Sequence, residues 1–422
     1  MATLAAPTMR SVPVTLAQQV QPATTPVPVH VVVRWALYLL AFSLPFEMPN
    51  RQIVPVEVPT LTAALFLCTT GLQPRVAYGR IPAALVWFFA CLYAYGLAAV
   101  VNGTDYGAEV IVLLLLLLQG ILVFWAAANL LRNEGVARGT LVSLGLACAA
   151  LALLSLAGIG RTSHVVYTGG ERLTVFGQNA NNTAMVLATG AIAVAGLAYV
   201  LVPSWPRQRW LAWPLAGLVG LAIIDTGSRG GLLALSAGLL AFMLGGRTAW
   251  LRIRNVSIGV LALGTLVGAS YHSTLMRNRL EVSAEGNFAG REAIFPGLIQ
   301  MSREKPLFGW GPVTNKYELG IRLHEIKHPR RDAHNALLEV LSATGVVGLI
   351  PFLIAVALCT LAAWRARQGH HGILPAAVLV VVLVANMSGN RIANKIFWIA
   401  CAYAVAATTY APAGRRDAVR LS

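Results

Sequence analysis

The stretch that decides the fold is RRDAHNALLEVLSATGVVGLIPF, residues 330–352, because it joins a charged cluster to a long apolar run. Between Ala336 and Trp364 the only charged residue is Glu339. A helix needs about 20 apolar residues to cross the hydrocarbon core of a bilayer. The run is therefore long enough to span a membrane, and His334 stands immediately before it.

The composition of the whole chain is that of an integral membrane protein. Of its 422 residues, 57% are hydrophobic and 11% are charged, whereas a soluble domain carries about 25% charged residues. The apolar runs are continuous rather than alternating, which favours helices over the strands of a barrel. We therefore predict an all-α integral membrane protein with about twelve transmembrane helices.

The twelve expected spans follow from run length alone. They are Val31–Leu44, Ile53–Leu72, Ile81–Val101, Val110–Leu131, Gly139–Ala157, Thr183–Val202, Trp210–Ile224, Gly230–Leu244, Val256–Ala269, Ala336–Trp364, Ile373–Ala385 and Ile392–Tyr410. This division makes residues 31–270 the first nine spans and 334–410 the last three. Residues 271–333 then form one long loop on a single side of the membrane.

Arginines in the short connections indicate the orientation. Every second connection is basic, as shown by Arg75, Arg80, Arg132, Arg138, Arg207, Arg209, Arg247, Arg252, Arg254, Arg365 and Arg367. By the positive-inside rule, these connections and both termini face the cytoplasm. Residues 1–30, rich in Ala, Pro and Thr, are expected to be a disordered cytoplasmic tail, and residues 411–422 a second tail. The net charge of +16 also suggests an anionic partner.

The long loop on the far side contains a helical pattern. Ile294, Leu298 and Met301 recur at helical spacing, which predicts an amphipathic helix lying on the outer leaflet. Phe308 and Trp310 suit an interfacial anchor. An ordinary surface hairpin would explain these features equally well.

Arg229 gives the sharpest chemical signal. It lies in a very short connection between two apolar runs, where an arginine is costly. Ser228 can cap the following helix, and the glycines after Arg229 let a ligand approach the backbone. A helix N-terminus with a guanidinium group is a phosphate-binding arrangement. The alternative is a structural ion pair with Asp225.

Further polar residues are expected on the same side. Arg172 and Arg291 are candidates for anion binding, although each alone could be a solvated surface residue. Asn179 and Asn182 can cap the next helix or hydrogen-bond sugar hydroxyl groups. Asn335 and Lys305 are further candidates for contact with a glycan or acceptor.

His334 is the candidate base. Asp332 fits an N-cap position, which would place His334 in the first helical turn. The helix dipole and nearby arginines would then disfavour the imidazolium form, and a neutral imidazole can act as a general base. Alternatively, His334 only hydrogen-bonds the backbone at the interface. Glu339 is expected on another helix face.

Five motifs in a fixed order carry a resemblance to a known family. They are ERLTVFGQNANNTA (171–184), TGSRGG (226–231), GRE (290–292), KPLFGWGP (305–312) and HNALLEVLSATGVVG (334–348). With these motifs the chain resembles the O-antigen ligase and polymerase family of bacterial membrane glycosyltransferases, and the ligases most. The segment GQNANNTA differs from the Gly-Asn-Pro-Asn type of motif that is more common in the family.

The resemblance implies a GT-C-like fold in the bacterial inner membrane, with the long loop and the active site facing the periplasm. It implies the transfer of a glycan from undecaprenyl diphosphate to the lipid A-core of lipopolysaccharide. The transfer would be inverting and would need no metal and no cofactor. His334 matches the family's catalytic histidine, and Arg229 and Arg291 match its essential arginines. Arg172 is a weaker match.

The partners implied are the lipid-linked glycan donor, the lipid A-core acceptor and membrane lipids, with no nucleic acid. A polymerase of the same family, which extends a lipid-linked glycan, remains an alternative. A flippase or other transporter is a second alternative, but transporters place their charges near the bilayer midplane and often show inverted repeats. Neither feature is apparent in the sequence.

Overall fold

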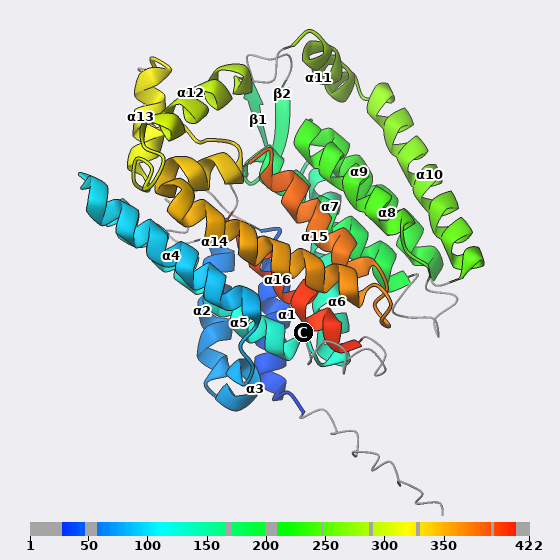
Figure 1. Cartoon of the computed structure of the whole chain (residues 1–422). Helices are drawn as coiled ribbons and strands as arrows, with labels where there is room; N and C mark the ends of the chain where they lie inside the picture. The colour runs from blue at the N-terminus through cyan, green and yellow to red at the C-terminus, as the bar shows by residue number, and fades with distance from the viewer. Residues whose placement is uncertain are drawn as a thin grey trace, which may run out of the picture.

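Long apolar helices run side by side and account for most of the described chain (Figure 1). The structure is a computed structural model, and it describes residues 28–46, 57–165, 171–198, 209–246, 248–286, 290–325, 330–389 and 392–410. The predicted terminal tails therefore lie outside the described residues, apart from residues 28–30. The rest of the fold is built around a buried apolar core.

Each of the twelve expected spans overlaps one observed helix. The helices are α1 (Val31–Ser43), α2 (Val58–Thr70), α4 (Ala83–Asn102), α5 (Gly107–Leu130), α6 (Glu134–Leu156), α7 (Ala180–Gly196), α8 (Arg209–Asp225), α9 (Arg229–Met243), α10 (Ala249–His272), α14 (Ala336–Ala366), α15 (Leu374–Asn386) and α16 (Lys395–Ala406). A short helix, α3 (Pro74–Tyr78), was not expected, and a 3-10 turn (Ala407–Tyr410) follows α16.

Five of these helices are long and apolar enough to cross a membrane, judged by length and composition. They are α4, α5, α6, α10 and α14. The protein is therefore a multi-pass membrane protein. Crossing of the membrane by all twelve helices, and a relation to the GT-C fold, stay predictions.

The all-α prediction is confirmed for the fold as a whole, with one local exception. After α6 the chain forms a two-stranded antiparallel hairpin, β1 (Arg161–Val165) and β2 (Glu171–Val175). The strands are rich in β-branched Thr and Val, and two glycines, Gly169 and Gly170, stand between them in the sequence. The length of apolar runs alone does not reveal such a short strand pair.

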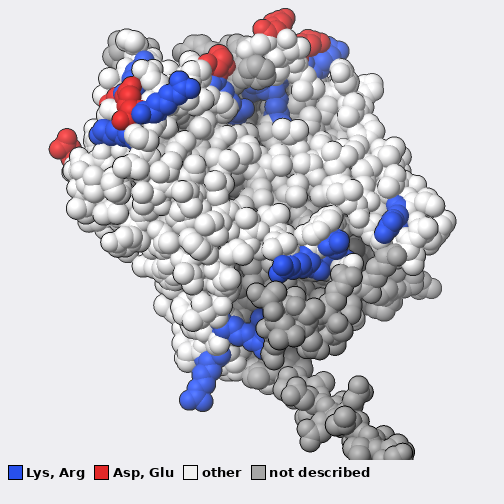
Figure 2. Space-filling view, viewed as in Figure 1, with Lys and Arg blue, Asp and Glu red and all other residues white. Residues whose placement is uncertain are grey.

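Charge divides the molecule into two ends and an apolar middle. On the face shown in Figure 2, one end carries both acidic and basic residues, the middle carries neither, and the opposite end shows only Lys and Arg. The mixed end contains α11 (Thr274–Ala284), α12 (Arg291–Glu304) and α13 (Thr314–Arg322), and the hairpin lies there too (Figure 1). We call it the loop end. Its assignment to the periplasm stays a prediction.

The predicted helix around Ile294 is confirmed as α12, but its expected seat on the lipid surface is wrong. Ile294, Leu298 and Met301 are buried, because they pack against α13 and the segment before α14. Trp310 is also tied to the protein, since its Nε1 donates to the carbonyl of Met301 at 2.9 Å. The apolar side of α12 therefore faces protein.

The KPLFGWGP turn packs against α14 at a break in that helix. At Gly345 the backbone leaves the helical conformation, with φ 62° and ψ −161°. A β-carbon there would collide with the carbonyl of Leu307. Four backbone hydrogen bonds join the two segments: Val346 N to Pro306 O (2.9 Å), Val347 N to Leu307 O (3.3 Å), Trp310 N to Ser342 O (2.8 Å) and Gly311 N to Ala343 O (3.1 Å). This interlock fixes the loop to the first half of α14, which His334 precedes.

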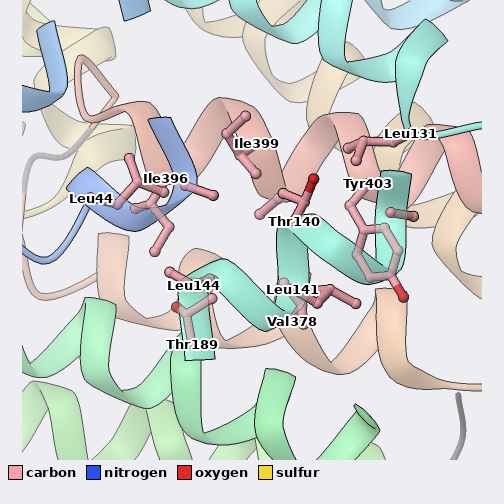
Figure 3. Close-up of a pocket in the computed structure, with 13 residues that line it drawn as sticks. Leu44, Leu131, Thr140, Leu141, Leu144, Thr189, Val378, Ile396, Ile399 and Tyr403 are labelled. Carbon is pink, nitrogen blue, oxygen red and sulfur yellow. The ribbon is translucent and has the colours of Figure 1, made fainter. Parts of the chain in front are cut away.

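One small cavity lies inside the helical core (Figure 3). Its lining is largely aliphatic, with Thr140, Thr189 and Tyr403 among the residues around it. A volume of about 20 Å³ holds one water at most. This cavity is a packing defect rather than a candidate site.

Candidate functional site

The turn after α15 brings three of the sequence motifs together at the loop end. Arg291 Nη2 donates to the carbonyl of Ser388 at 2.9 Å. Asn335 Nδ2 lies 3.5 Å from the carbonyl of Met387. A β-carbon on Gly230 would collide with the side chain of Ser388, so glycine is required where α9 passes this turn. The starts of α9, α12 and α14 therefore surround residues 387–388.

The start of α7 joins this group. Ser228 caps α9 as predicted, because its Oγ accepts from Gly231 N at 3.1 Å. The same hydroxyl donates to Asn181 Oδ1 at 2.8 Å. Residues at the N-termini of four helices, α7, α9, α12 and α14, are thus linked by contacts in one region. Their dipoles add positive potential there, which favours an anion.

Arg229 is the first residue of α9 and reaches toward α11. Its Nη1 donates to the carbonyl of Arg279 at 3.2 Å and also contacts Ser283 Oγ. Ser283 lies in the last turn of α11, where a cation is favoured by the helix dipole, and Arg279 lies in the middle of that helix. The side chain of Arg229 therefore sits between the two helices α9 and α11.

Three arginines gather at this point, and we call Arg229, Arg279 and Arg291 the arginine cluster. Burial lowers the pKa of Arg279, and the charges of Arg229 and Arg291 lower it further. Burial also lowers the pKa of Arg291, followed by the charge of Arg229, while the carboxylate of Glu292 acts in the opposite direction. Like charges this close favour binding of an anion.

Sequence reasoning missed Arg279. The available signal was its position three residues after Met276 on the same face of α11, a face that the structure buries. Arg277, on the other face, is exposed and lies 3.9 Å from Glu281. The two arginines differ only in their positions around the helix, which put Arg279 on the buried face and Arg277 on the exposed face.

The expected N-cap of α14 was wrong, and the correction moves His334. Asn335 is the cap, because its Oδ1 accepts from Leu337 N at 2.9 Å and from Leu338 N at 3.1 Å. His334 therefore lies before the helix rather than in its first turn, and its φ of 50° is in the left-handed region. His334 is half-buried, and the next residue, Asn335, lies against the same turn that Arg291 contacts.

Asp332 is taken by another partner. Lys316 Nζ lies 2.6 Å from Asp332 Oδ1 and 3.7 Å from Glu339 Oε1. Burial alone would raise the pKa of Asp332, but the charge and hydrogen bond of Lys316 lower it below its usual value. Glu339, which was expected on another face from His334, lies against Lys316.

Other cations of the loop end are also paired. Arg330 lies 2.6 Å from Glu109, and Arg322 lies 2.5 Å from Glu304 and 2.8 Å from Glu318. We call Lys316, Arg322 and Arg330, with their carboxylates, the paired cluster. It ties α12, α13 and the segment before α14 to one another and to the start of α5.

The remaining predicted residues have structural contacts. Asn179 caps α7, since its Oδ1 accepts from Asn181 N at 3.0 Å. Asn182 is 1% exposed and accepts from Asn394 Nδ2 at 3.0 Å. Capping, the simpler of the two sequence interpretations, is therefore correct for Asn179. A role of either side chain in glycan binding stays a prediction.

Lys305 and Arg172 are placed differently. Lys305 Nζ donates to Asn102 Oδ1 at 3.0 Å and lies 4.2 Å from the centre of the Trp310 ring, so it links the loop to α4. Arg172 lies in β2 opposite His164 of β1. Its side chain lies outside the described part of the structure, so its anion-binding role also stays a prediction.

An apolar cavity of about 410 Å³ lies between α7, α8, α9 and α10. On α8 its lining runs from Ala212 to Ile224, a distance of about 18 Å at the helical rise. On α10 it ends at Ala269, and α11 begins five residues later. Ile224 is likewise five residues before Arg229. The cavity therefore leads along the apolar helices toward the arginine cluster.

Comparison with known proteins agrees with the motifs. Residues 214–353 match the family model described as O-Antigen ligase, and this range includes the arginine cluster and His334. A curated O-antigen ligase of Pseudomonas aeruginosa is 27% identical over 227 residues, which cover 52% of this chain and 51% of the relative. The chain thus spans about half the length of the curated relative it matches. Over these residues, the chain is similar to the O-antigen ligase family.

Proposed function

We propose that the protein is an inner-membrane glycosyltransferase that transfers a glycan from undecaprenyl diphosphate to a sugar hydroxyl of lipid A-core. The observation that supports this proposal is that the starts of α9, α12 and α14, in or next to which Arg229, Arg291 and His334 lie, meet at the turn of residues 387–388 at one end of an apolar helical body. An anion-binding group and a candidate base then serve the same face of the membrane, which we take to be the periplasmic face.

The arginine cluster is proposed to bind the diphosphate of the donor. Guanidinium groups match phosphate oxygens with paired hydrogen bonds, and the four converging helix N-termini add to the positive potential. When the glycan leaves, negative charge grows on the diphosphate. Fixed positive groups stabilise that charge more in the transition state than in the ground state, so they lower the barrier without a metal ion.

The apolar cavity beside the cluster supports a lipid-linked donor. Its walls are formed almost entirely by apolar side chains of α7 to α10, and it extends along the helices rather than outward into the loop. A polyprenyl chain lying there would place its diphosphate near the start of α9. A soluble nucleotide-sugar donor would gain nothing from such a surface.

His334 is proposed to act as the general base. The acceptor hydroxyl oxygen attacks C1 of the donor glycan, and the bond from C1 to the diphosphate oxygen breaks with its electron pair. The acceptor proton passes to the imidazole, and undecaprenyl diphosphate leaves. One displacement of this kind inverts the configuration at C1. Asn335, Lys305, Asn179, Asn182 and Arg172 remain candidates for contact with the glycan, the acceptor or the diphosphate.

Reconstitution tests the proposal. Purified protein is mixed with undecaprenyl-diphosphate glycan and lipid A-core in the presence of a chelator, and the products are separated by size. We expect a glycan–core product at the rate seen without chelator. A longer lipid-linked glycan as the sole product would indicate a polymerase instead. Loss of all transfer on chelation, with recovery on adding a divalent metal, would contradict the metal-independent mechanism.

A further inference from the structure

Arg279 is the most enclosed of the three arginines in the cluster. Its side chain and backbone together are 4% exposed. Within the described part of the chain, its Nε and Nη1 atoms have no hydrogen-bond partner. A buried guanidinium group that makes no hydrogen bonds through these atoms is costly, because burial removes the water that would solvate it.

The turn before α9 is shaped to hold this side chain. Gly227 has φ 61°, and a β-carbon there would lie 3.2 Å from Arg279 Cδ. The glycine of the TGSRGG motif thus leaves room for the stem of Arg279 directly beside Arg229. The carbonyl of Arg279 also accepts from Arg229 Nη1 at 3.2 Å, so the two residues are tied together through the backbone.

A purely structural role does not account for this placement. Structural arginines at the same end of the molecule are paired, as Arg322 is with Glu304 and Glu318. Arg279 instead faces the charges of Arg229 and Arg291. A buried charge without a carboxylate partner costs free energy, so the fold alone gives no reason to keep an arginine there.

We propose that Arg279 is a third phosphate-binding guanidinium group, which turns toward the diphosphate when that anion enters between Arg229 and Arg291. This inference rests on the proposed function, because it uses the same diphosphate site. It assigns to α11 a direct part in donor binding. With three guanidinium groups, the site would prefer a diphosphate over a monophosphate of the same lipid.

The test measures binding of undecaprenyl diphosphate and undecaprenyl monophosphate to the full-length protein in detergent, together with the melting temperature of the ligand-free protein. The variant is Arg279→Met, and the matched control is Arg277→Met on the exposed face of the same helix. We expect Arg279→Met to bind the diphosphate at least tenfold more weakly, with a smaller loss for the monophosphate. Its ligand-free melting temperature should be equal to or above that of the wild type.

Diphosphate binding by Arg279→Met within twofold of wild type would overturn the inference, as would an equal loss in the Arg277→Met control. If Arg279→Met does not fold, Arg279→Lys carries the test. This variant keeps the charge but not the planar fork. Weaker diphosphate binding supports the inference, and wild-type binding refutes it. Failure of the wild-type protein to bind either lipid would instead count against the proposed function itself.

Discussion

Two groups of charged residues at the loop end differ in how their charges are satisfied. In the paired cluster, Lys316, Arg322 and Arg330 each lie within 2.5–2.8 Å of a carboxylate oxygen. In the arginine cluster, the charges of Arg229 and Arg291 act on Arg279, whose Nε and Nη1 atoms have no hydrogen-bond partner among the described residues. The first group holds loop helices together. The second places three positive charges together, with the carboxylate of Glu292 acting on Arg229 and Arg291.

We propose that this difference separates residues that build the fold from residues that bind a ligand. In an ion pair, each charge already has its partner within the protein. Breaking the pair is therefore expected mainly to lower the stability of the fold. A guanidinium group among like charges is stabilised most when an anion binds. Its removal is therefore expected to weaken ligand binding and to lower the transfer rate more than it lowers stability. The predictions below apply this comparison to individual residues.

The largest effect is expected at His334. His334→Asn removes the imidazole but keeps a residue type that tolerates the left-handed φ of 50°. Transfer should fall by about 10²–10⁴, the usual contribution of a general base, while donor binding is retained. His324, an exposed loop histidine with φ 54°, provides the matched control as His324→Asn. Near wild-type transfer by His334→Asn would show that the imidazole is not the base.

The next largest effect is expected for Arg291→Lys and Arg229→Lys. Lysine keeps the charge but cannot form paired hydrogen bonds to a phosphate, so transfer should fall by about 10²–10³. Donor binding should weaken in both variants, measured with undecaprenyl diphosphate. The control is Arg322→Lys in the paired cluster, which should transfer at nearly the wild-type rate. Equal losses in all three variants would remove the distinction between the two groups.

A stability effect is expected at Lys316. Lys316→Met leaves the buried carboxylate of Glu339 without its partner, which costs about 3–5 kcal/mol when a buried pair is broken. The melting temperature should fall clearly, while the folded protein binds undecaprenyl diphosphate with unchanged affinity. Adding Glu339→Gln should recover much of the loss. Weaker diphosphate binding with normal stability would place Lys316 in the binding site instead.

The smallest effect is expected at Arg330. Its side chain is 49% exposed and pairs with Glu109, which is 40% exposed, so water and salt screen the pair. Exposed pairs contribute about 0–1 kcal/mol. Arg330→Gln should therefore change the melting temperature little and leave transfer unchanged. A large loss of transfer would extend the functional site to the segment before His334.

The sequence predicted the helical body well, because each apolar run must form a helix to satisfy its backbone in lipid. It did not predict the break at Gly345, because that break depends on backbone hydrogen bonds to a turn about 35 residues earlier in the chain. It also predicted the wrong cap for α14, Asp332 instead of Asn335. Both residue types cap helices well, and the ion pair to Lys316 decides the choice.

For the site, the sequence predicted Arg229, Arg291 and His334 on the same side, and the structure brings the starts of α9, α12 and α14 around one turn. It missed Arg279, because an arginine in a charged loop looks the same whether its helix face is buried or exposed. The turn at residues 387–388 was missed for a related reason. It contributes mainly backbone carbonyls, which carry no signature in the side-chain sequence.

The most direct test is an experimental structure of the protein in a lipid bilayer with undecaprenyl diphosphate bound. We predict density for the diphosphate between Arg229, Arg279 and Arg291, with the lipid chain in the cavity between α7, α8, α9 and α10. Density for the diphosphate against the paired cluster, or at the opposite end of the helical body, would contradict the account.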